Sequence, residues 1–311
     1  MNQRTIVLIT GGLGMVANRL AFWLKQQGYE VWGLSRSPQK KSENFDKMLG
    51  WDIEKNFIDP SFRLAHHIVH LAGAGIMDKY WTASRKREIM DSRVNSTKLL
   101  LAELSKDKGE VVGFIQASAI GIYPSSLDSK WETPVPCNQI TEQSKNFAQS
   151  VCLNWERAAM PIKDLGIRFN VVRIGIVLST RGGALPEMLK SFNVNVGTYF
   201  GKGNQWISWV HIDDLCRQFI HLIAHNELSG LHHGSGAAPC TGEALQHAIA
   251  KAMNKRALIT SMPEFVLKLV LGERAEVALQ SSFAPCNTLP DFKFKFESAE
   301  LAVKDLLTAK T

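Results

Sequence analysis

The stretch that most constrains the fold is the beginning of the chain, where residues 5–28 read TIVLITGGLGMVANRLAFWLKQQG. The apolar run Ile6–Ile9 leads into a turn of spacing T-G-G-x-G-x-x-A, and apolar residues at helical spacing follow it up to Gly28. Glycines let the backbone turn sharply beside a pyrophosphate, and a helix N-terminus then presents unpaired N–H groups to it. An ordinary glycine-rich turn is the alternative, but this strand–turn–helix context favours a dinucleotide site. The predicted cofactor residues of the turn are Gly11, Gly12, Leu13, Gly14, Met15 and Val16.

The second predicted strand, Glu30–Leu34, ends at Ser35-Arg36-Ser37. An NAD enzyme has an acidic residue at this place to hold the ribose hydroxyls, whereas here an arginine stands between two hydroxyls. Because a guanidinium matches the 2′-phosphate of NADP, the sequence predicts NADP as the cofactor. The alternative is a solvated surface arginine.

Strands and helices alternate through the first half of the chain, which predicts an α/β protein with a Rossmann-type, doubly wound parallel sheet. A strand within HHIVHLAGAG leads to Leu71, Ala72 and Gly73, the second predicted approach to the cofactor, and a short strand at Trp51–Ile53 is expected to face the adenine. The later predicted elements are a helix at Thr82–Lys106, a strand VVGFIQAS ending at Ser118, a helix at Asn146–Leu165 and a strand at Arg168–Val177.

Past Ser179 the pattern changes to shorter elements and becomes mainly helical from Pro263, with a last helix at Ser298–Thr308. The sequence therefore predicts two parts, which fits a chain of 311 residues. An NADP-binding Rossmann domain covers 1–178, with 204–235 returning to it. A smaller, mainly helical substrate lobe covers 179–203 and 236–311, and it is expected to cap the carboxyl ends of the strands.

Composition excludes several other classes of protein. No apolar run approaches the ~20 residues of a membrane span, so no membrane partner is expected. The net charge of +7 is spread along the chain apart from short clusters such as Arg85-Lys86-Arg87, which favours a solvated basic surface over nucleic-acid binding. His66, His67 and His70 alternate faces along a strand and have no acidic companion, so we predict packing or surface roles and no metal.

The five cysteines are widely spaced and include no C-x-x-C, which indicates free thiols in a reducing compartment. Since the first strand begins by residue 6, it leaves no room for a signal peptide, and we expect a cytoplasmic protein, either a monomer or a homodimer.

Several motifs together resemble the extended short-chain dehydrogenase/reductase superfamily, the NAD(P)-dependent epimerase/dehydratases: TGGxGxxA, LAG, the strand end at Ser118, the strand with Arg173, and SWVHIDDL. Longer segments are similar to one subfamily, the "epimerase family proteins" with a C-terminal domain of unknown function, some of which have been labelled cell-division inhibitors. These segments are DKYWTASRKREIMDSRVNSTKLL, GIVLSTRGGALPEML, GNQWISWVHIDDL and PEFVLKLVLGERAEVAL. The resemblance covers essentially the whole chain and departs at SSFAPCNTLPD, before Phe292, where the subfamily has a basic, proline-containing segment.

The resemblance implies NADP contacts at Ser35, Arg36, Leu71, Ala72, Glu88, Arg93 and Val177. It also implies a serine that holds the substrate oxygen, and Ser118 matches it. A hydride-transfer member of the superfamily further uses a tyrosine as general acid/base, with a lysine four residues later. Here Phe147 and Val151 occupy those positions, and no tyrosine lies between 124 and 198.

Two hypotheses therefore stand. In the first, the protein is an NADP-dependent oxidoreductase or epimerase that acts on an unknown small molecule, for which a sugar nucleotide is one candidate. Its general acid/base is then a residue at another position than the usual tyrosine. Ser118 and Tyr123 are the candidate catalytic residues, with Lys202 and His211 as further candidates and a packed, non-catalytic Tyr123 as the alternative. In the second, the protein binds NADP without turnover, as a scaffold or sensor.

Overall fold

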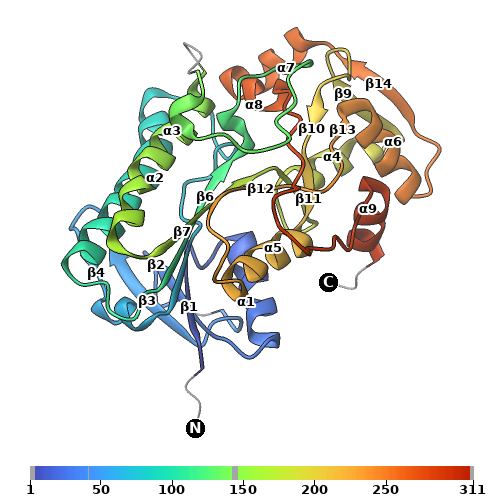
Figure 1. The fold of residues 1–311 in the computed structure, drawn as a ribbon. Coiled ribbons are helices and arrows are strands. Elements are labelled where there is room, and N and C mark those ends of the chain that lie inside the picture. Colours follow the sequence, from blue (N-terminus) through green and yellow to red (C-terminus); the bar gives the residue numbers. More distant parts are fainter. Residues whose placement is uncertain (1–3, 41, 142–145, 309–311) are drawn as a thin grey trace.

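The computed structural model describes residues 4–40, 42–141 and 146–308, so the outermost residues of the predicted domain ranges, 1–3 and 309–311, lie outside it. An eight-stranded sheet in the order β12-β7-β6-β5-β1-β2-β3-β4 forms its centre (Figure 1). Every neighbouring pair is parallel except β3 and β4. The strands are β1 (Ile6–Thr10), β2 (Glu30–Ser35), β3 (Lys47–Asp52), β4 (Phe57–Ile58), β5 (His67–His70), β6 (Gly113–Ala119), β7 (Arg168–Ile174) and β12 (Gly230–Gly234). The predicted doubly wound α/β fold is confirmed.

Helices cover both faces of this sheet. On one face α1 (Met15–Gln26) packs against α5 (Ile212–Ala224), and on the other α2 (Ala83–Lys106) packs against α3 (Phe147–Ala159). Each face has its own buried apolar cluster, because the parallel strands are apolar on both sides. The strand order reverses beside β1, between β2 and β5, and open sheets of this kind bind ligands at that point.

Local chemistry explains where the helices of the sheet begin and end. Helix α1 buries the apolar positions Ala17, Leu20 and Leu24, and Gly28, at φ +84°, ends the segment. Helix α2 begins where the hydroxyl oxygen of Thr82 accepts a hydrogen bond from the backbone N–H of Arg85.

Two predicted elements are interrupted in the structure. The helix predicted at Asn146–Leu165 is α3 followed by a 3₁₀ helix, η4 (Met160–Leu165), because Pro161 lacks the N–H that would continue the α-helix. The strand predicted at Arg168–Val177 is β7 followed by β8 (Ile176–Leu178), which pairs with β11 (Trp209–His211) instead of the main sheet. Gly175 lies at the break, where a Cβ would overlap the carbonyl of Ser208.

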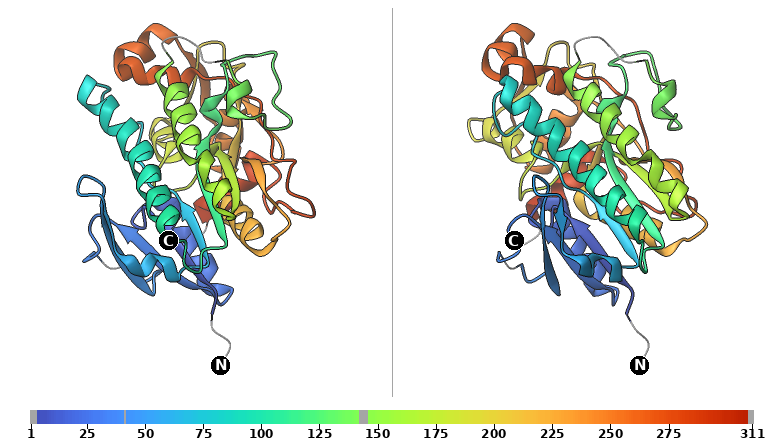
Figure 2. Two further views of the ribbon diagram at one scale, coloured as in Figure 1. Left: turned by 60° about the vertical axis from the view of Figure 1, so that its left-hand side comes forward. Right: turned by 90° about the vertical axis from the view of Figure 1, so that its left-hand side faces the viewer.

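The later segments form a lobe beyond the carboxyl ends of the strands (Figures 1 and 2). Besides its helices it contains a parallel pair of strands, β9 with β14, and a strand β13 that pairs antiparallel with β10 (Trp206–Ile207) of the segment 204–235. Its elements are α4 (Ala184–Phe192), β9 (Val196–Phe200), β13 (Cys240–Thr241), α6 (Gly242–Ala252), β14 (Leu258–Met262), α7 (Glu264–Leu271), η5 (Gly272–Arg274), α8 (Ala275–Leu279) and α9 (Ala299–Thr308). Three further 3₁₀ helices are η1 (Pro60–Leu64), η2 (Ile120–Ile122) and η3 (Cys137–Gln139). Within the described ranges, none of the helices has the length and apolarity that crossing a bilayer requires.

Candidate functional site

A cleft of about 810 Å³ opens at the carboxyl ends of β1, β2, β3 and β5 and runs along α2. Its size falls in the range of about 300–1,000 Å³ that is usual for small-molecule and cofactor sites. Residues 51–54, at the end of β3, form part of its lining, where the sequence suggested an approach to the adenine. The predicted cofactor residues that line this cleft are Gly11, Leu13, Ser35, Arg36, Ser37, Ala72, Gly73 and Glu88.

The glycine turn is held close to the end of β5. Gly11 has φ +69°, its N–H donates to the carbonyl of Leu34 at 3.0 Å, and a Cβ placed on it would lie 3.1 Å from the Cα of Ala72. The turn closes with a bond from the N–H of Gly14 to the carbonyl of Gly11 at 2.8 Å. Asn18, which the sequence analysis did not single out, braces the turn by donating from Nδ2 to the carbonyls of Gly12 and Gly14.

A buried polar network beneath the turn fixes the end of β5. The hydroxyl oxygen of Thr10 accepts from the backbone N–H groups of Leu71 and Ala72, both at 3.0 Å, and therefore donates to His70 Nδ1 at 2.7 Å. His70 Nε2 lies 3.0 Å from the hydroxyl of Thr97, which itself donates to a backbone carbonyl. Burial lowers the pKa of His70 to about 3, so the ring is neutral and acts as a structural bridge.

The end of β2 exposes an arginine. Ser35 is buried, and its hydroxyl oxygen accepts from the N–H of Ser37 at 3.1 Å, which shapes the turn that carries Arg36. The side chain of Arg36 is exposed in the cleft, and no carboxylate of the described ranges lies within ion-pair distance of it. An anionic ligand would therefore meet a guanidinium that forms no ion pair with a carboxylate of the described residues.

Glu88 and Arg93, the two predicted residues of α2, have different partners. The carboxylate of Glu88 accepts from Arg85 Nη1 at 2.7 Å, and this bond is the main cause that lowers its pKa. Arg93 is not paired with Glu88: its Nη1 donates to the carbonyls of Ala74 and Ile89, and its guanidinium lies over the ring of Trp155. Burial lowers the pKa of Arg93. Arg93 thus braces the loop after β5, and Glu88 faces the cleft.

Ser118 and Tyr123 lie in contrasting surroundings. Ser118 is at the end of β6, 2% exposed, and its hydroxyl has no hydrogen-bond partner among the described residues. Tyr123 is fully buried; its hydroxyl oxygen accepts from Arg173 Nη1 at 2.8 Å and donates to His233 Nε2 at 2.6 Å. Burial raises the pKa of Tyr123, and the guanidinium of Arg173 opposes that shift. The hydroxyl of Ser118 is thus unpaired but enclosed, since Ser118 is not among the residues that line the cleft, whereas the hydroxyl of Tyr123 is hydrogen-bonded to the protein on both sides.

The remaining predicted residues lie beyond the lining of the cleft. Met15, Val16, Leu71 and Val177 pack against the core cluster on the α1 face. Both Met15 and Val177 approach Gly183 in the loop before α4, and Met15 also approaches Gly182. Of the further candidates, Lys202 is exposed, and His211 is buried with its Nδ1 accepting from the N–H of Asp213 at the start of α5. No group of three or more potential metal ligands occurs in the part of the chain that the structure describes.

These observations fit a nicotinamide dinucleotide. The cleft has the required size and position, the glycine turn permits close approach of a pyrophosphate, and Ser118 offers an unpaired buried hydroxyl at the same sheet edge. When bound, such a cofactor supplies hydride exchange at its nicotinamide ring. A sequence model described as the NAD dependent epimerase/dehydratase family matches residues 7–232.

The chain belongs to this family. An epimerase family protein of Staphylococcus epidermidis is 33% identical over 317 aligned positions, which cover 97% of this chain and 99% of the relative. The human epimerase family protein SDR39U1, crystallised with NADPH, superposes with a TM-score of 0.84 at 26% identity over 97% of this chain and 99% of its own. A UDP-N-acetylglucosamine 4-epimerase from Bacillus cereus shares the fold, with a TM-score of 0.73 at 14% identity over 97% of this chain and 98% of its own. The predicted resemblance to the epimerase family proteins is confirmed.

The positions of the expected tyrosine and lysine are apolar and packed in this family member. Val151 is 1% exposed and belongs to a buried cluster with Trp81, Ile89 and Ala148. The ring of Phe147 packs edge-on against Trp81, with centroids 4.9 Å apart. The α3 helix therefore supplies packing surface at the two positions where hydride-transfer members of the superfamily have the acid/base pair, as the replacement by Phe147 and Val151 indicated.

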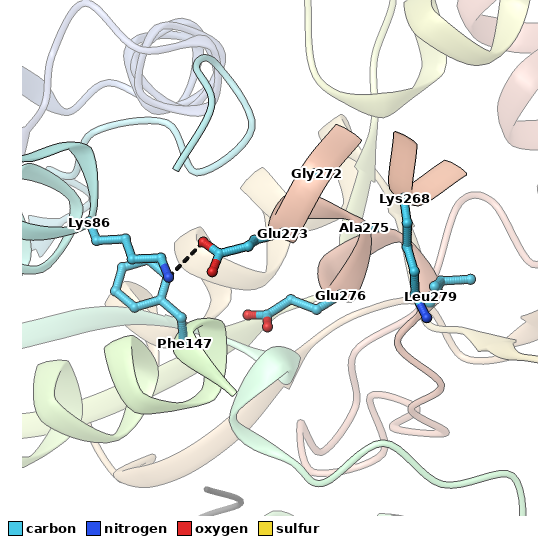
Figure 3. A pocket seen from close by; sticks show the side chains of 8 residues that line it. All are labelled: Lys86, Phe147, Lys268, Gly272, Glu273, Ala275, Glu276 and Leu279. Carbon is cyan, nitrogen blue, oxygen red and sulfur yellow. Dashed lines mark ion pairs between the residues drawn. The ribbon is translucent and has the colours of Figure 1, made fainter. Parts of the chain in front are cut away.

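A second cavity, of about 430 Å³, lies where the lobe meets the first turns of α2 and α3 (Figure 3). Lys86 and Phe147 line one side of it, and Figure 3 shows Glu273 and Glu276 reaching toward them from η5 and α8. Lys86 pairs with Glu273 at 2.6 Å, and the carboxylate of Glu276 accepts from the N–H of Ala148 at 2.9 Å. Burial raises the pKa of Glu276. Sequence reasoning missed this cavity because its walls come from segments almost 200 residues apart.

Proposed function

We propose that the protein binds NADP(H) in preference to NAD(H) and acts as an oxidoreductase or epimerase on a small molecule. The observation that carries the cofactor choice is the exposed guanidinium of Arg36, which stands between Ser35 and Ser37 at the end of β2 without a carboxylate partner among the described residues. That position would need an acidic side chain to hold the ribose hydroxyls of NAD. The NADPH in the crystal structure of the human relative supports the same choice.

The proposal for turnover rests on Ser118. A buried hydroxyl without a partner among the described residues is unfavourable unless a ligand completes it, and a substrate oxygen or the cofactor would do so. In this proposal Tyr123 is a positioning residue, since its hydroxyl already joins Arg173 and His233. The lobe, 179–203 with 236–311, covers the substrate, and the protein needs neither a metal nor a nucleic-acid partner.

A second candidate function is a protein that binds NADP without turnover. The apolar packing of Phe147 and Val151 favours it, because neither side chain can exchange a proton and Val151 is enclosed by Trp81, Ile89 and Ala148. Both candidates share the cofactor cleft, so the cofactor experiment comes first.

Calorimetric titration of the purified protein with NADPH and NADH tests the cofactor preference. We expect NADPH to bind about 10–150-fold more tightly, the effect of a charge-assisted phosphate contact of roughly 1.5–3 kcal/mol. Arg36→Ala should remove most of that difference, and Arg256→Ala, an exposed arginine between α6 and β14, is the matched control. Equal affinities in the unmodified protein, or an unchanged preference in Arg36→Ala, would overturn the proposal.

Ser118→Ala separates the two candidates. In an enzyme, a substrate-like compound that raises the melting temperature of the NADPH complex should lose its effect in Ser118→Ala, while NADPH keeps its own. A variant that responds like the unmodified protein to every such compound would favour the non-catalytic candidate.

A further inference from the structure

The three side chains of the basic run Arg85-Lys86-Arg87 have different surroundings and different partners. Arg85 is buried, donates to the carbonyl of Gly75 and pairs with Glu88. Lys86 pairs with Glu273 of the lobe. Arg87 is exposed and has no carboxylate within ion-pair distance among the described residues, although Asp91 follows it by one helical turn. Of these three charges, that of Arg87 is thus without an ion-pair partner in the part of the chain that the structure describes.

Arg87 lines the same cleft as Arg36, although the two come from different elements. The cleft also contains carboxylates, and two of them are paired with cations of the protein: Asp52 with Lys55 at 3.1 Å, and Glu88 with Arg85 at 2.7 Å. Glu54 and Asp91 complete its acidic lining. Arg36 lies near enough to Glu88, the neighbour of Arg87, to contribute to the lowered pKa of that carboxyl after the larger effect of Arg85.

We propose that Arg87 is the second arginine of a clamp that binds the 2′-phosphate of NADP(H) between the end of β2 and the first turns of α2. This inference rests on the proposed cofactor and names a specificity residue that the resemblance did not imply. Two guanidiniums suit a phosphate monoester, because each presents a planar fork of donors to a different pair of oxygens. Because Glu88 is paired with Arg85, the guanidiniums of Arg36 and Arg87 remain to bind the phosphate.

The test uses two ligands that differ only in the 2′-phosphate, AMP and adenosine 2′,5′-bisphosphate, so that it measures binding and needs no turnover. Each is titrated into the full chain and into Arg36→Ala, Arg87→Ala and Arg87→Lys, with Arg256→Ala as the control. We expect Arg87→Ala to weaken the bisphosphate by about 10-fold or more and AMP by less than about 2-fold, which isolates the phosphate. Arg87→Lys should recover part of the loss, because it keeps the charge without the fork.

The outcomes separate this inference from the proposed function. If the unmodified protein does not prefer the bisphosphate, the NADP proposal itself fails. If Arg36→Ala loses the preference while Arg87→Ala keeps it, NADP stands and the clamp is refuted. Equal weakening of both ligands in Arg87→Ala also refutes the clamp, since Arg87 would then act on the adenosine 5′-phosphate. Circular dichroism and the melting temperature of each variant, compared with those of Arg256→Ala, show whether the variant keeps the overall fold.

Discussion

The hydroxyl of Tyr123 offers a direct measurement of whether this residue acts in packing or in chemistry. Its two partners are both buried: Arg173 is 0% exposed and His233 is 1% exposed. Arg173 also makes a bidentate pair with Glu156, with both N–O distances at 2.8 Å. Tyr123→Phe removes only the oxygen, so the ring keeps its stacking on Trp131, with centroids 4.4 Å apart.

The expected loss of stability in Tyr123→Phe follows from the two buried groups that lose their hydrogen-bond partner. One N–H of a buried guanidinium and one ring nitrogen of His233 are left unpaired, and each unpaired buried group costs about 1–3 kcal/mol, with more for a charged one. We therefore predict that Tyr123→Phe lowers the free energy of unfolding by about 2–5 kcal/mol and leaves NADPH affinity unchanged. A tyrosine whose hydroxyl faced the cleft would show the opposite pattern, with stability near that of the unmodified protein and turnover reduced by about 10²-fold or more.

Urea unfolding, with the slope m checked for constancy, measures the stability term, and calorimetry measures NADPH affinity. Tyr80→Phe is the matched control, since its hydroxyl also donates one hydrogen bond, to the carbonyl of Val270 at 2.8 Å, but the side chain is 59% exposed. We expect that control to lose less than about 1 kcal/mol. If Tyr123→Phe were as stable as Tyr80→Phe, the structural role argued for this hydroxyl would be wrong.

Three further outcomes are expected. Thr10→Val should lower the free energy of unfolding by about 2–5 kcal/mol, because two backbone N–H groups and a ring nitrogen of His70 lose their hydrogen-bond partner. Thr10→Ser keeps the hydroxyl and should lose only about 1 kcal/mol for the missing methyl group. Equal urea midpoints of the two variants would contradict this. Phe147→Tyr combined with Val151→Lys should destabilise the protein by several kcal/mol and give no hydride transfer with common sugar nucleotides. The absorbance of NADPH measures hydride transfer, and a stable, active double variant would show that only two side chains were missing. Burial, aided by the charge of Glu273, raises the pKa of Glu276, so the folded protein keeps this proton to a higher pH than the unfolded chain does. The free energy of unfolding should therefore fall as the pH rises from the pKa of Glu276 in the unfolded chain to its pKa in the folded protein. The free energy of unfolding, measured with urea at several pH values in that range, should depend less on pH in Glu276→Gln than in the unmodified protein. The same pH dependence in both would count against this assignment.

Local signals explain why the cofactor half of the molecule was predictable. The strand, glycine turn and helix at residues 5–28 are contiguous, and the positions of Ser35, Arg36 and Ala72 follow from where the next strands end. Since the carboxyl ends of parallel strands meet at one edge, residues that share no sequence neighbourhood still converge there. Contiguous patterns of this kind indicated seven of the predicted residues that line the cleft, and the family resemblance indicated the eighth, Glu88.

Pairings across long separations explain what the sequence did not reveal. The partners of Tyr123 are 50 and 110 residues away, at Arg173 and His233, and no periodicity connects them. Strand β14 was missed because its five residues, LITSM, show little alternation of apolar and polar side chains, and among the described residues it pairs with β9 alone. The break at Gly175 depends on the carbonyl of Ser208, which only the folded chain brings near.

The replacement of the expected tyrosine and lysine has a structural consequence beyond the loss of a proton donor. Val277 of α8 packs against the cluster that contains Val151 and Trp81, and Glu276 caps the backbone N–H of Ala148 from the same helix. The lobe is therefore attached to α3 at the very turn where a family enzyme would need a polar, solvated pair. A buried lysine at 151 would both desolvate its charge and separate these surfaces, so restoring the pair works against closure of the lobe. This packing leaves α3 without a proton-exchanging pair at positions 147 and 151, which directs the search for chemistry away from α3 and toward Ser118 at the end of β6.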